Sequence, residues 1–371
     1  EKKERGEPFD NKINSWDFMY YHTLLKQKEY TIDEDVVKEY FPLDTVKRGL
    51  ERAYQQILGL IFTKVEEPEE LWHPDVECYS VQDAATQEFL GFYYLDLYPR
   101  EGKYDHAAVS GLQCACDMEP TAQPVEGATR QCSVACMMAN FTKPTATKPS
   151  LLQHSEVVTF FHEFGHVMHQ LCTKARFAQF AGTATERDFV EAPSQMLENW
   201  CWEEQPLKNM SGHYQDAGKV LPEELLKNML AAKNLNSGLL NLRQVFFGKY
   251  DLTIHRAKGR VDTGAEWSRL RESVSLIPNS SGGNGAAAFG HIMGGYDAGY
   301  YGYLWSEVFS ADMFSIFKES GDLYSPVVGA RYRTCILEPG GSRDGDEMVT
   351  SFLGRPLNPD AFLLTNGLIS A

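Results

Sequence analysis

The most constraining feature of the sequence is a strongly apolar, helix-patterned stretch at residues 156–172 with polar residues in its middle. Its apolar side chains recur at helical spacing and form one stripe, made of Phe160, Phe161, Phe164, Val167, Met168 and Leu171. Ser155 precedes the stretch and is a candidate N-cap. Core helices rarely carry several polar side chains unless a partner satisfies them. The stretch therefore predicts a buried helix that carries a functional polar site.

The polar residues inside this helix have the spacing of a metal site. His162 and His166 are four residues apart, so both imidazoles project from one face and can reach one ion. Glu163 lies beside that pair, where it can accept a proton from metal-bound water. Gly165 costs helix stability relative to alanine, about 1 kcal/mol, which indicates that another element packs closely there. His169 shares the face of the two histidines, and we expect it to support the site rather than bind the metal.

A third protein ligand has to come from elsewhere, because a catalytic zinc takes three and leaves one position for water. Residues 188–202 predict a second helix, in which Asp188 and Glu191 are spaced as a capping pair and Pro193 lies in the first turns. Glu191 and Glu198 are seven residues apart and share a face. On spacing alone either carboxylate could be the ligand, while the other orients a histidine from behind.

A glycine-rich segment near residues 278–302 is unlike ordinary core sequence. Its glycines permit close backbone approach and hinge conformations. It leads into side chains that can donate hydrogen bonds to an oxyanion forming on a scissile carbonyl, namely His291, Tyr296, Tyr300 and Tyr303. The alternative is a packing turn with aromatic core residues, and composition does not separate the two hypotheses.

Periodicity along the chain predicts a mainly α fold with a small β-sheet, an α+β protein. The first 65 residues are expected to be helical, as is most of the chain after Pro149, apart from the glycine-rich segment. Short aromatic and β-branched runs at 78–99 and 131–141 predict strands, and residues 100–130 are rich in turn formers.

Composition excludes several classes of partner. The formal charge of −16 argues against a nucleic-acid partner, and no apolar run approaches the roughly 18 residues that spanning a bilayer requires. Eight cysteines are spread along the chain, and we expect free, buried thiols. A structural zinc site at Cys114, Cys116, Cys132 and Cys136 is the alternative, although their spacing is not the usual one. Reduced cysteines favour a cytoplasmic protein.

Together these residues resemble the thimet oligopeptidase, neurolysin and saccharolysin family of zinc oligopeptidases. The stretches that carry the resemblance lie at 161–171, 181–199 and 289–307, with weaker support at 240–244 and 335–342. The resemblance implies a zincin-like metallopeptidase with one zinc ion per chain, and it implies that Glu191 is the third ligand. It also implies that Tyr303, with His291, Tyr296 and Tyr300 nearby, binds substrate and steadies the tetrahedral intermediate. Members of the family cleave short peptides internally, as zinc-dependent endopeptidases. A mitochondrial location is the alternative to the cytoplasmic one.

One departure from the family is large, because its full-length members are nearly twice as long. We therefore expect residues 1–371 to be a catalytic half, helical over 1–70, with a small sheet and loops over 71–150 and a helical zinc- and substrate-binding region over 151–371. The N-terminal half that forms a channel wall in the family is then missing and is a candidate partner, besides short peptide substrates. Two alternatives stay open: a related peptidyl-dipeptidase or mitochondrial presequence-processing peptidase, and an inactive peptide-binding fragment.

Overall fold

The computed structural model describes the chain except for residues 1–2, 7, 10, 119–128, 280–282 and 370–371. The chain divides into two compact units, one formed by residues 1–32 and 231–305 and the other by residues 33–230 and 306–371. We call the first the tyrosine unit and the second the histidine unit, after the predicted site residues that each contains. Most of the described secondary structure is helical, and the strands lie within residues 60–138, as expected of an α+β protein.

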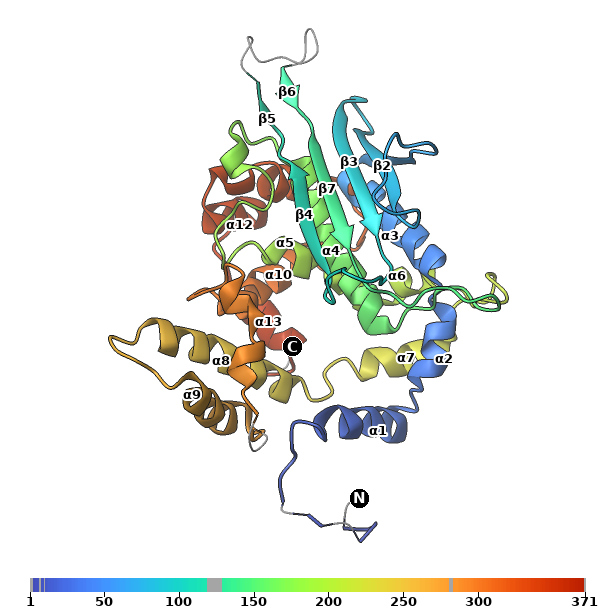
Figure 1. Ribbon diagram of the computed structural model, residues 1–371. Coiled ribbons are helices and arrows are strands. Elements are labelled where there is room, and N and C mark those ends of the chain that lie inside the picture. Colours follow the sequence, from blue (N-terminus) through green and yellow to red (C-terminus); the bar gives the residue numbers. More distant parts are fainter. Residues whose placement is uncertain (1–2, 7, 10, 119–128, 280–282, 370–371) are drawn as a thin grey trace. The chain divides into compact units, whose positions relative to one another are not determined.

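A five-stranded mixed sheet is the framework of the histidine unit (Figure 1). Its strands lie in the order β1-β2-β3-β7-β4, in which β3 and β7 are parallel and the other neighbours are antiparallel. The strand bounds are β1 Leu60–Lys64, β2 Glu77–Asp83, β3 Phe89–Asp96, β4 Ala108–Gln113 and β7 Ser133–Met138. Two short strands, β5 (Cys116–Asp117) and β6 (Arg130–Gln131), pair separately.

Helix α4 (His154–Cys172) packs against strands β3, β4 and β7 of this sheet (Figure 1). The predicted apolar stripe is confirmed, because Phe160, Phe164 and the other four members are all buried. The helix begins earlier than the expected N-cap at Ser155. Gln153 precedes its first turn, and the Glu156 carboxylate accepts a hydrogen bond from the backbone N–H of Gln153 at 2.7 Å. This carboxylate satisfies an otherwise unpaired N–H, which moves the helix start by two residues.

Helices make up the rest of the histidine unit. Two helices precede the sheet along the chain, α2 (Glu34–Val37) and α3 (Leu43–Leu58). Three follow α4, namely α5 (Ala192–Glu198), α6 (Glu204–Asn209) and α7 (Glu223–Ala231). The C-terminal part contains α10 (Gly302–Glu319), which starts at the end of the tyrosine unit, α11 (Pro326–Tyr332), α12 (Gly345–Leu353) and α13 (Asp360–Thr365).

Two expectations about local structure were wrong. Helix α3 ends at Gly59, whose φ of +65° terminates it, and residues 60–64 form strand β1 instead of continuing a helix. The turn-rich stretch 100–130 contains strand β4. The last four residues of this strand are exposed because it lies at an edge of the sheet. Its amphipathic pattern is weak for that reason, and only pairing with β7 defines it.

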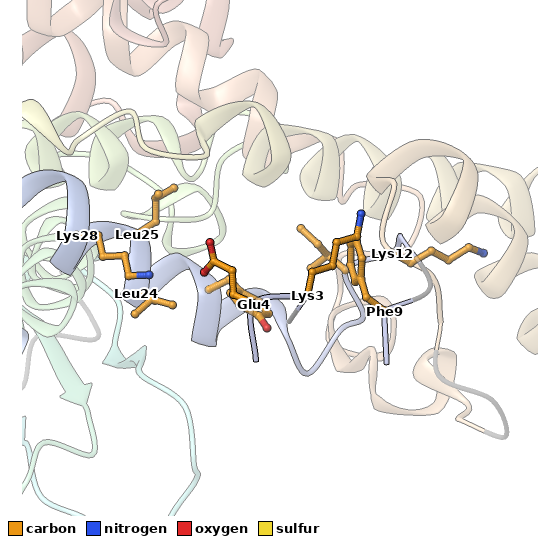
Figure 2. Close-up of a pocket in the computed structure, with 9 residues that line it drawn as sticks. Lys3, Glu4, Phe9, Lys12, Leu24, Leu25 and Lys28 are labelled. Atoms are coloured by element: carbon orange, nitrogen blue, oxygen red, sulfur yellow. The ribbon is translucent and has the colours of Figure 1, made fainter. Parts of the chain in front are cut away.

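The tyrosine unit contains α1 (Phe18–Tyr30), α8 (Ser237–His255) and α9 (Thr263–Leu270), followed by short helical turns at Gly285–Ala288 and Gly290–Met293. Its core is an aromatic cluster of buried residues, namely Phe246, Tyr250, Trp267, Leu270, Phe289 and Tyr300. A cavity of about 530 Å³ lies beside α1 in this unit (Figure 2). Lysines and apolar side chains between residues 3 and 28 line it, and none of the predicted site residues does.

The cysteines agree with the expectation of free thiols. All eight lie in the described residues and none forms a disulfide. Within that part of the chain, the cysteines form no group that could hold a metal ion, so the alternative zinc site at Cys114 to Cys136 finds no support. As for membranes, every helix of the described residues is too short or too polar to cross a bilayer.

Candidate metal centre

Two imidazoles and one carboxylate converge on a point beside helix α4. The Nε2 atoms of His162 and His166 each lie 3.2 Å from Oε2 of Glu191. One ligand atom from each residue lies within 4.8 Å of the others, and the group is the one in the described residues that could hold a metal ion. The Glu191 side chain is only 3% exposed, whereas the two histidines are 19% and 13% exposed. The cluster is therefore enclosed on the carboxylate side and partly exposed on the imidazole side.

Glu191 lies one residue before helix α5 rather than within a helix starting near Asp188, as expected from the sequence. Residues 187–191 form turns, and the helix begins at Ala192 with Pro193 in its first turn. Proline favours this position because it lacks the N–H that a helix start leaves unpaired. The Ser194 hydroxyl donates to the backbone carbonyl of Glu191 at 2.9 Å, which holds the turn that directs the carboxylate toward the histidines.

Helices α4 and α5 pack closely because Gly165 has no side chain. A Cβ atom at this position would lie 2.8 Å from Cα of Ser194 and 3.4 Å from Cδ1 of Leu197. The distance to Cα of Ser194 is far shorter than ordinary contact, so any side chain would push α5 away from α4. The close packing inferred from the presence of this glycine is confirmed, and it brings Glu191 within reach of the histidines.

We predict that Gly165→Ala lowers the free energy of unfolding by about 1–2 kcal/mol, although alanine favours a helix by about 1 kcal/mol. The reason is that overpacking against a close neighbour costs about 1–3 kcal/mol. Chemical denaturation measures this change. Gly238→Ala is the matched control, since Gly238 is exposed in α8 with no atom within 4 Å of an added Cβ, and it should not destabilise. A Gly165→Ala protein as stable as the parent would show that α5 shifts without cost.

Glu198 contacts His162 from the opposite side of the ring. Its Oε1 atom accepts from Nδ1 of His162 at 2.7 Å, while Nε2 of the same ring faces Glu191. When the ring is neutral, this Nδ1–H donor leaves Nε2 with a lone pair, which is the tautomer that a metal ligand needs. The two carboxylates that spacing alone could not distinguish thus occupy different positions around one imidazole.

Glu163 lies on the same helix and is 8% exposed. Burial raises the pKa of its carboxyl, and positive charge on His162 and His166 opposes the rise. For Glu191, burial would also raise the pKa, but hydrogen bonds from the two histidines outweigh it and hold the pKa well below its ordinary value. The neighbouring carboxyls therefore differ in basicity: Glu191 stays ionised, and Glu163 is the better proton acceptor.

His169 was expected to support the site, and the structure gives it no such contact. It is fully buried, and neither ring nitrogen has a hydrogen-bond partner among the described residues. Burial lowers its pKa to about 3, so the ring is neutral at physiological pH. The group of potential metal ligands does not include it.

The other predicted site residues lie in the tyrosine unit, in what we call the glycine–tyrosine segment, residues 289–303. The rings of Tyr296 and Tyr303 are stacked, with centroids 5.0 Å apart and planes 20° apart. The His291 ring packs edge-on against Tyr303 and Tyr300, at 5.7 Å and 5.2 Å. The structure thus brings His291, Tyr296, Tyr300 and Tyr303 together within this unit.

Tyr300 differs from its neighbours because it is a core residue. Its side chain is 6% exposed, and its hydroxyl donates to Oε1 of Gln244 at 3.0 Å. Gln244 and Asp251 both contact this segment from α8, and neither was predicted as a site residue. Their spacing was the available signal: polar residues seven apart on an aromatic-rich helix share one face.

A small sheet covered by a helix with two histidines, and a carboxylate supplied just before the next helix, is the architecture of a zincin-type metallopeptidase. The model of peptidase family M3 matches residues 1–368, and the chain belongs to that family. Its relationship to the thimet oligopeptidases and saccharolysin, inferred above from motifs, is confirmed.

Comparison with individual proteins gives the extent of the match. A thimet-like oligopeptidase of Dictyostelium discoideum is 45% identical over 372 residues, 99% of this chain and 54% of that protein. Saccharolysin of Saccharomyces cerevisiae is 38% identical over 376 residues, 99% of this chain and 52% of that protein. A solved carboxypeptidase of Pyrococcus furiosus shares the fold, with a TM-score of 0.52, 12% identity, and coverage of 97% of this chain and 70% of its own. The chain therefore spans about half the length of these curated relatives.

Proposed function

We propose that this chain carries the catalytic site of a zinc-dependent endopeptidase that hydrolyses short peptides. The observation that carries the proposal is the convergence of His162 Nε2, His166 Nε2 and Glu191 Oε2 within 4.8 Å. Membership of peptidase family M3 and similarity to proteins named oligopeptidases support the substrate class. Since the chain spans about half of those relatives, we propose that it is their catalytic half and that the remaining half limits access to short peptides.

The donor set fits zinc. Two imidazole nitrogens and one ionised carboxylate are the His₂Glu combination that catalytic zinc sites use, and they leave a fourth position open. The neighbouring Glu198 fits as well, because a histidine ligand commonly donates its other ring N–H to a carboxylate. A zinc ion held there would act as a Lewis acid, lowering the pKa of a water molecule and polarising the scissile carbonyl.

Glu163 is the general base in this proposal. It follows His162 directly on α4, and positive charge on His162 and His166 acts on its buried carboxyl. The raised pKa of this buried group brings its basicity closer to the operating pH, where a base is most effective. It takes the proton from the attacking water and delivers it to the departing amine of the peptide.

The glycine–tyrosine segment supplies the hydrogen-bond donors for the substrate in this proposal. Tyr303 is assigned to the developing oxyanion, with His291 and Tyr296 contacting the peptide beside it. The rings of these three residues contact one another, which supports a shared role. Tyr300 is more buried and its hydroxyl is occupied by Gln244, which favours a supporting role for it rather than the direct substrate contact expected from the resemblance.

Metal content tests the ligand assignment directly. We predict about one zinc ion per chain, lost in Glu191→Ala as in variants of either histidine, because removing one of three protein ligands leaves too few to hold the ion. Elemental analysis after dialysis gives the stoichiometry. Glu198→Ala is the matched control: it removes a carboxylate from the same histidine and should weaken zinc binding about 10- to 100-fold without abolishing it. Full zinc content in Glu191→Ala, with loss in Glu198→Ala, would transfer the ligand role to Glu198.

The class of reaction requires a separate measurement. The zinc-loaded protein, alone and together with any additional segment of the full-length protein, is incubated with a defined peptide of about ten residues. Cleavage at internal bonds supports an endopeptidase, whereas stepwise release of dipeptides would indicate a peptidyl-dipeptidase. Absence of cleavage by the full-length, zinc-loaded protein would indicate a peptide-binding protein instead.

A further inference from the structure

One face of helix α8 contacts the glycine–tyrosine segment at three successive points. Gln244 accepts a hydrogen bond from the Tyr300 hydroxyl, Gly248 lies next to the Tyr301 backbone, and Asp251 accepts from backbone N–H groups. An added Cβ at Gly248 would lie 3.4 Å from Cα of Tyr301. The spacing of four and then three residues places all three positions on the same side of the helix.

Asp251 makes the strongest of these contacts. Its carboxylate is completely buried and accepts from the N–H of Ala298 at 2.9 Å through Oδ1 and from the N–H of Tyr300 at 3.0 Å through Oδ2. His255, one helical turn further on, faces Oδ1 with its Nδ1 atom at 2.8 Å. A buried carboxylate is costly unless it is fully hydrogen-bonded, and hydrogen bonds to an ionised acceptor are stronger than neutral ones. The pairing therefore stabilises the segment in one conformation.

The backbone held by Asp251 has an unfavourable conformation. Ala298 has φ of +53°, in the left-handed region that residues with a Cβ atom seldom adopt. Such conformations persist only where the surroundings hold them. The hydrogen bond from the Ala298 N–H to Asp251 stabilises the backbone at the strained residue itself. In the sequence, Ala298 lies between Tyr296 and Tyr303, whose rings stack on each other.

We propose that Asp251 is a positioning residue of the peptidase reaction, which acts through the backbone of Ala298 and Tyr300. By accepting hydrogen bonds from these two N–H groups, it fixes the turn between Tyr296 and Tyr303. The hydroxyls of the two tyrosines then stay in fixed positions relative to each other and to His291. The inference rests on the proposed function of the segment in binding the oxyanion and the substrate. Helix α8 supplies none of the proposed ligands or donors. In this inference its role is to hold the segment that carries the donors in place.

Asp251→Asn tests the proposal, because asparagine has the same shape but replaces one acceptor oxygen with an amide group that cannot accept a hydrogen bond. We expect kcat to fall about 10²-fold, the loss typical of misplaced catalytic groups, while KM changes only a few-fold and zinc content stays at the parental level. The double variant Asp251→Asn/Tyr303→Phe should lose much less than the product of the two single losses, since both changes remove the same donor from its place.

Asp312→Asn is the matched control. Asp312 in α10 is also a buried carboxylate that accepts from a backbone N–H, that of Asn358 at 2.8 Å, and from Arg355, but it lies in the histidine unit. It should lower stability, and its effect on kcat should multiply independently with Tyr303→Phe. Two results would overturn the proposal. One is a double variant Asp251→Asn/Tyr303→Phe whose loss of kcat equals the product of the two single losses. The other is a parental kcat in Asp251→Asn beside an impaired Tyr303→Phe.

Amide hydrogen exchange of residues 296–303 separates this proposal from the proposed function of the segment. Exchange should be at least about 10-fold faster in Asp251→Asn and unchanged in Asp312→Asn, since the released N–H groups become free to exchange. Unchanged exchange in Asp251→Asn would overturn the anchoring role. Parental kcat in all tyrosine variants would overturn the proposed function of the segment. The positioning role would then fall as well, even if faster exchange in Asp251→Asn showed that Asp251 holds the backbone. If Asp251→Asn does not fold, Asp251→Glu replaces it in every measurement, because the longer side chain keeps the carboxylate but moves its oxygens away from the N–H groups of Ala298 and Tyr300.

Discussion

Glu163→Gln is expected to retain zinc and to lose peptide hydrolysis by about 10²- to 10⁴-fold, the contribution typical of a general base. Glutamine has almost the same shape and volume as glutamate but cannot accept the proton of the attacking water. The ligands His162, His166 and Glu191 are unaltered, so the metal should stay bound. Steady-state kinetics on a short quenched peptide, after elemental analysis of each preparation, measures both properties.

The control for this variant is another glutamate whose pKa burial raises, in the same unit but outside the cluster. Glu51 in α3 meets this description, and its carboxylate accepts a hydrogen bond from the Tyr93 hydroxyl at 3.4 Å. Glu51→Gln should leave kcat within a few-fold of the parent. Turnover close to parental in a zinc-loaded Glu163→Gln protein would remove Glu163 from the role of base.

Tyr303→Phe is expected to lower kcat by about 10²- to 10³-fold, equivalent to about 3–4 kcal/mol of transition-state stabilisation. A donor directed at charge that exists only in the transition state contributes little to binding of the ground state, so KM should change much less than kcat. The phenyl ring is retained, and its stacking on Tyr296 should persist. Steady-state kinetics with one peptide and with checked zinc content gives both constants.

Tyr296→Phe and Tyr300→Phe are the comparisons within the same segment. The Tyr300 hydroxyl is bonded to Gln244, so Tyr300→Phe should reduce stability by about 1 kcal/mol, the usual net value of one hydrogen bond. Its kcat should fall less than that of Tyr303→Phe. An impaired Tyr296→Phe beside a parental Tyr303→Phe would move the oxyanion role to Tyr296, and three active variants would make the segment structural.

Much of the fold follows from periodicity, and the errors have a common cause. The buried stripe of α4 and strands β2, β3 and β7 are visible as apolar patterns because each is covered on at least one face. Strands β1 and β4 form the two edges of the sheet; the apolar start of β1 continues the helical spacing of α3, and the exposed residues of β4 show no apolar pattern. Edge strands depend on pairing with a neighbour, which is a long-range contact that a local window does not contain.

For the candidate site, local spacing was sufficient where the residues share one helix. The positions of His162, Glu163 and His166 on a common side of α4 follow from 3.6 residues per turn. The resemblance to a peptidase family adds a function to this pattern. The presence of Gly165 even indicated a close neighbour, although not which helix it would be.

The different positions of Glu191 and Glu198 depended on the packing of two helices. Both carboxylates have a spacing suited to the site, but α5 begins only after Glu191, and its distance from α4 is set by the contact of Gly165 with Ser194. This packing places Glu191 at Nε2 of both histidines and Glu198 at Nδ1 of His162. The same holds for Asp251, whose hydrogen bonds reach residues 47 and 49 positions away along the chain. Such contacts depend on how helices and loops pack, and the spacing of residues within one element does not predict them.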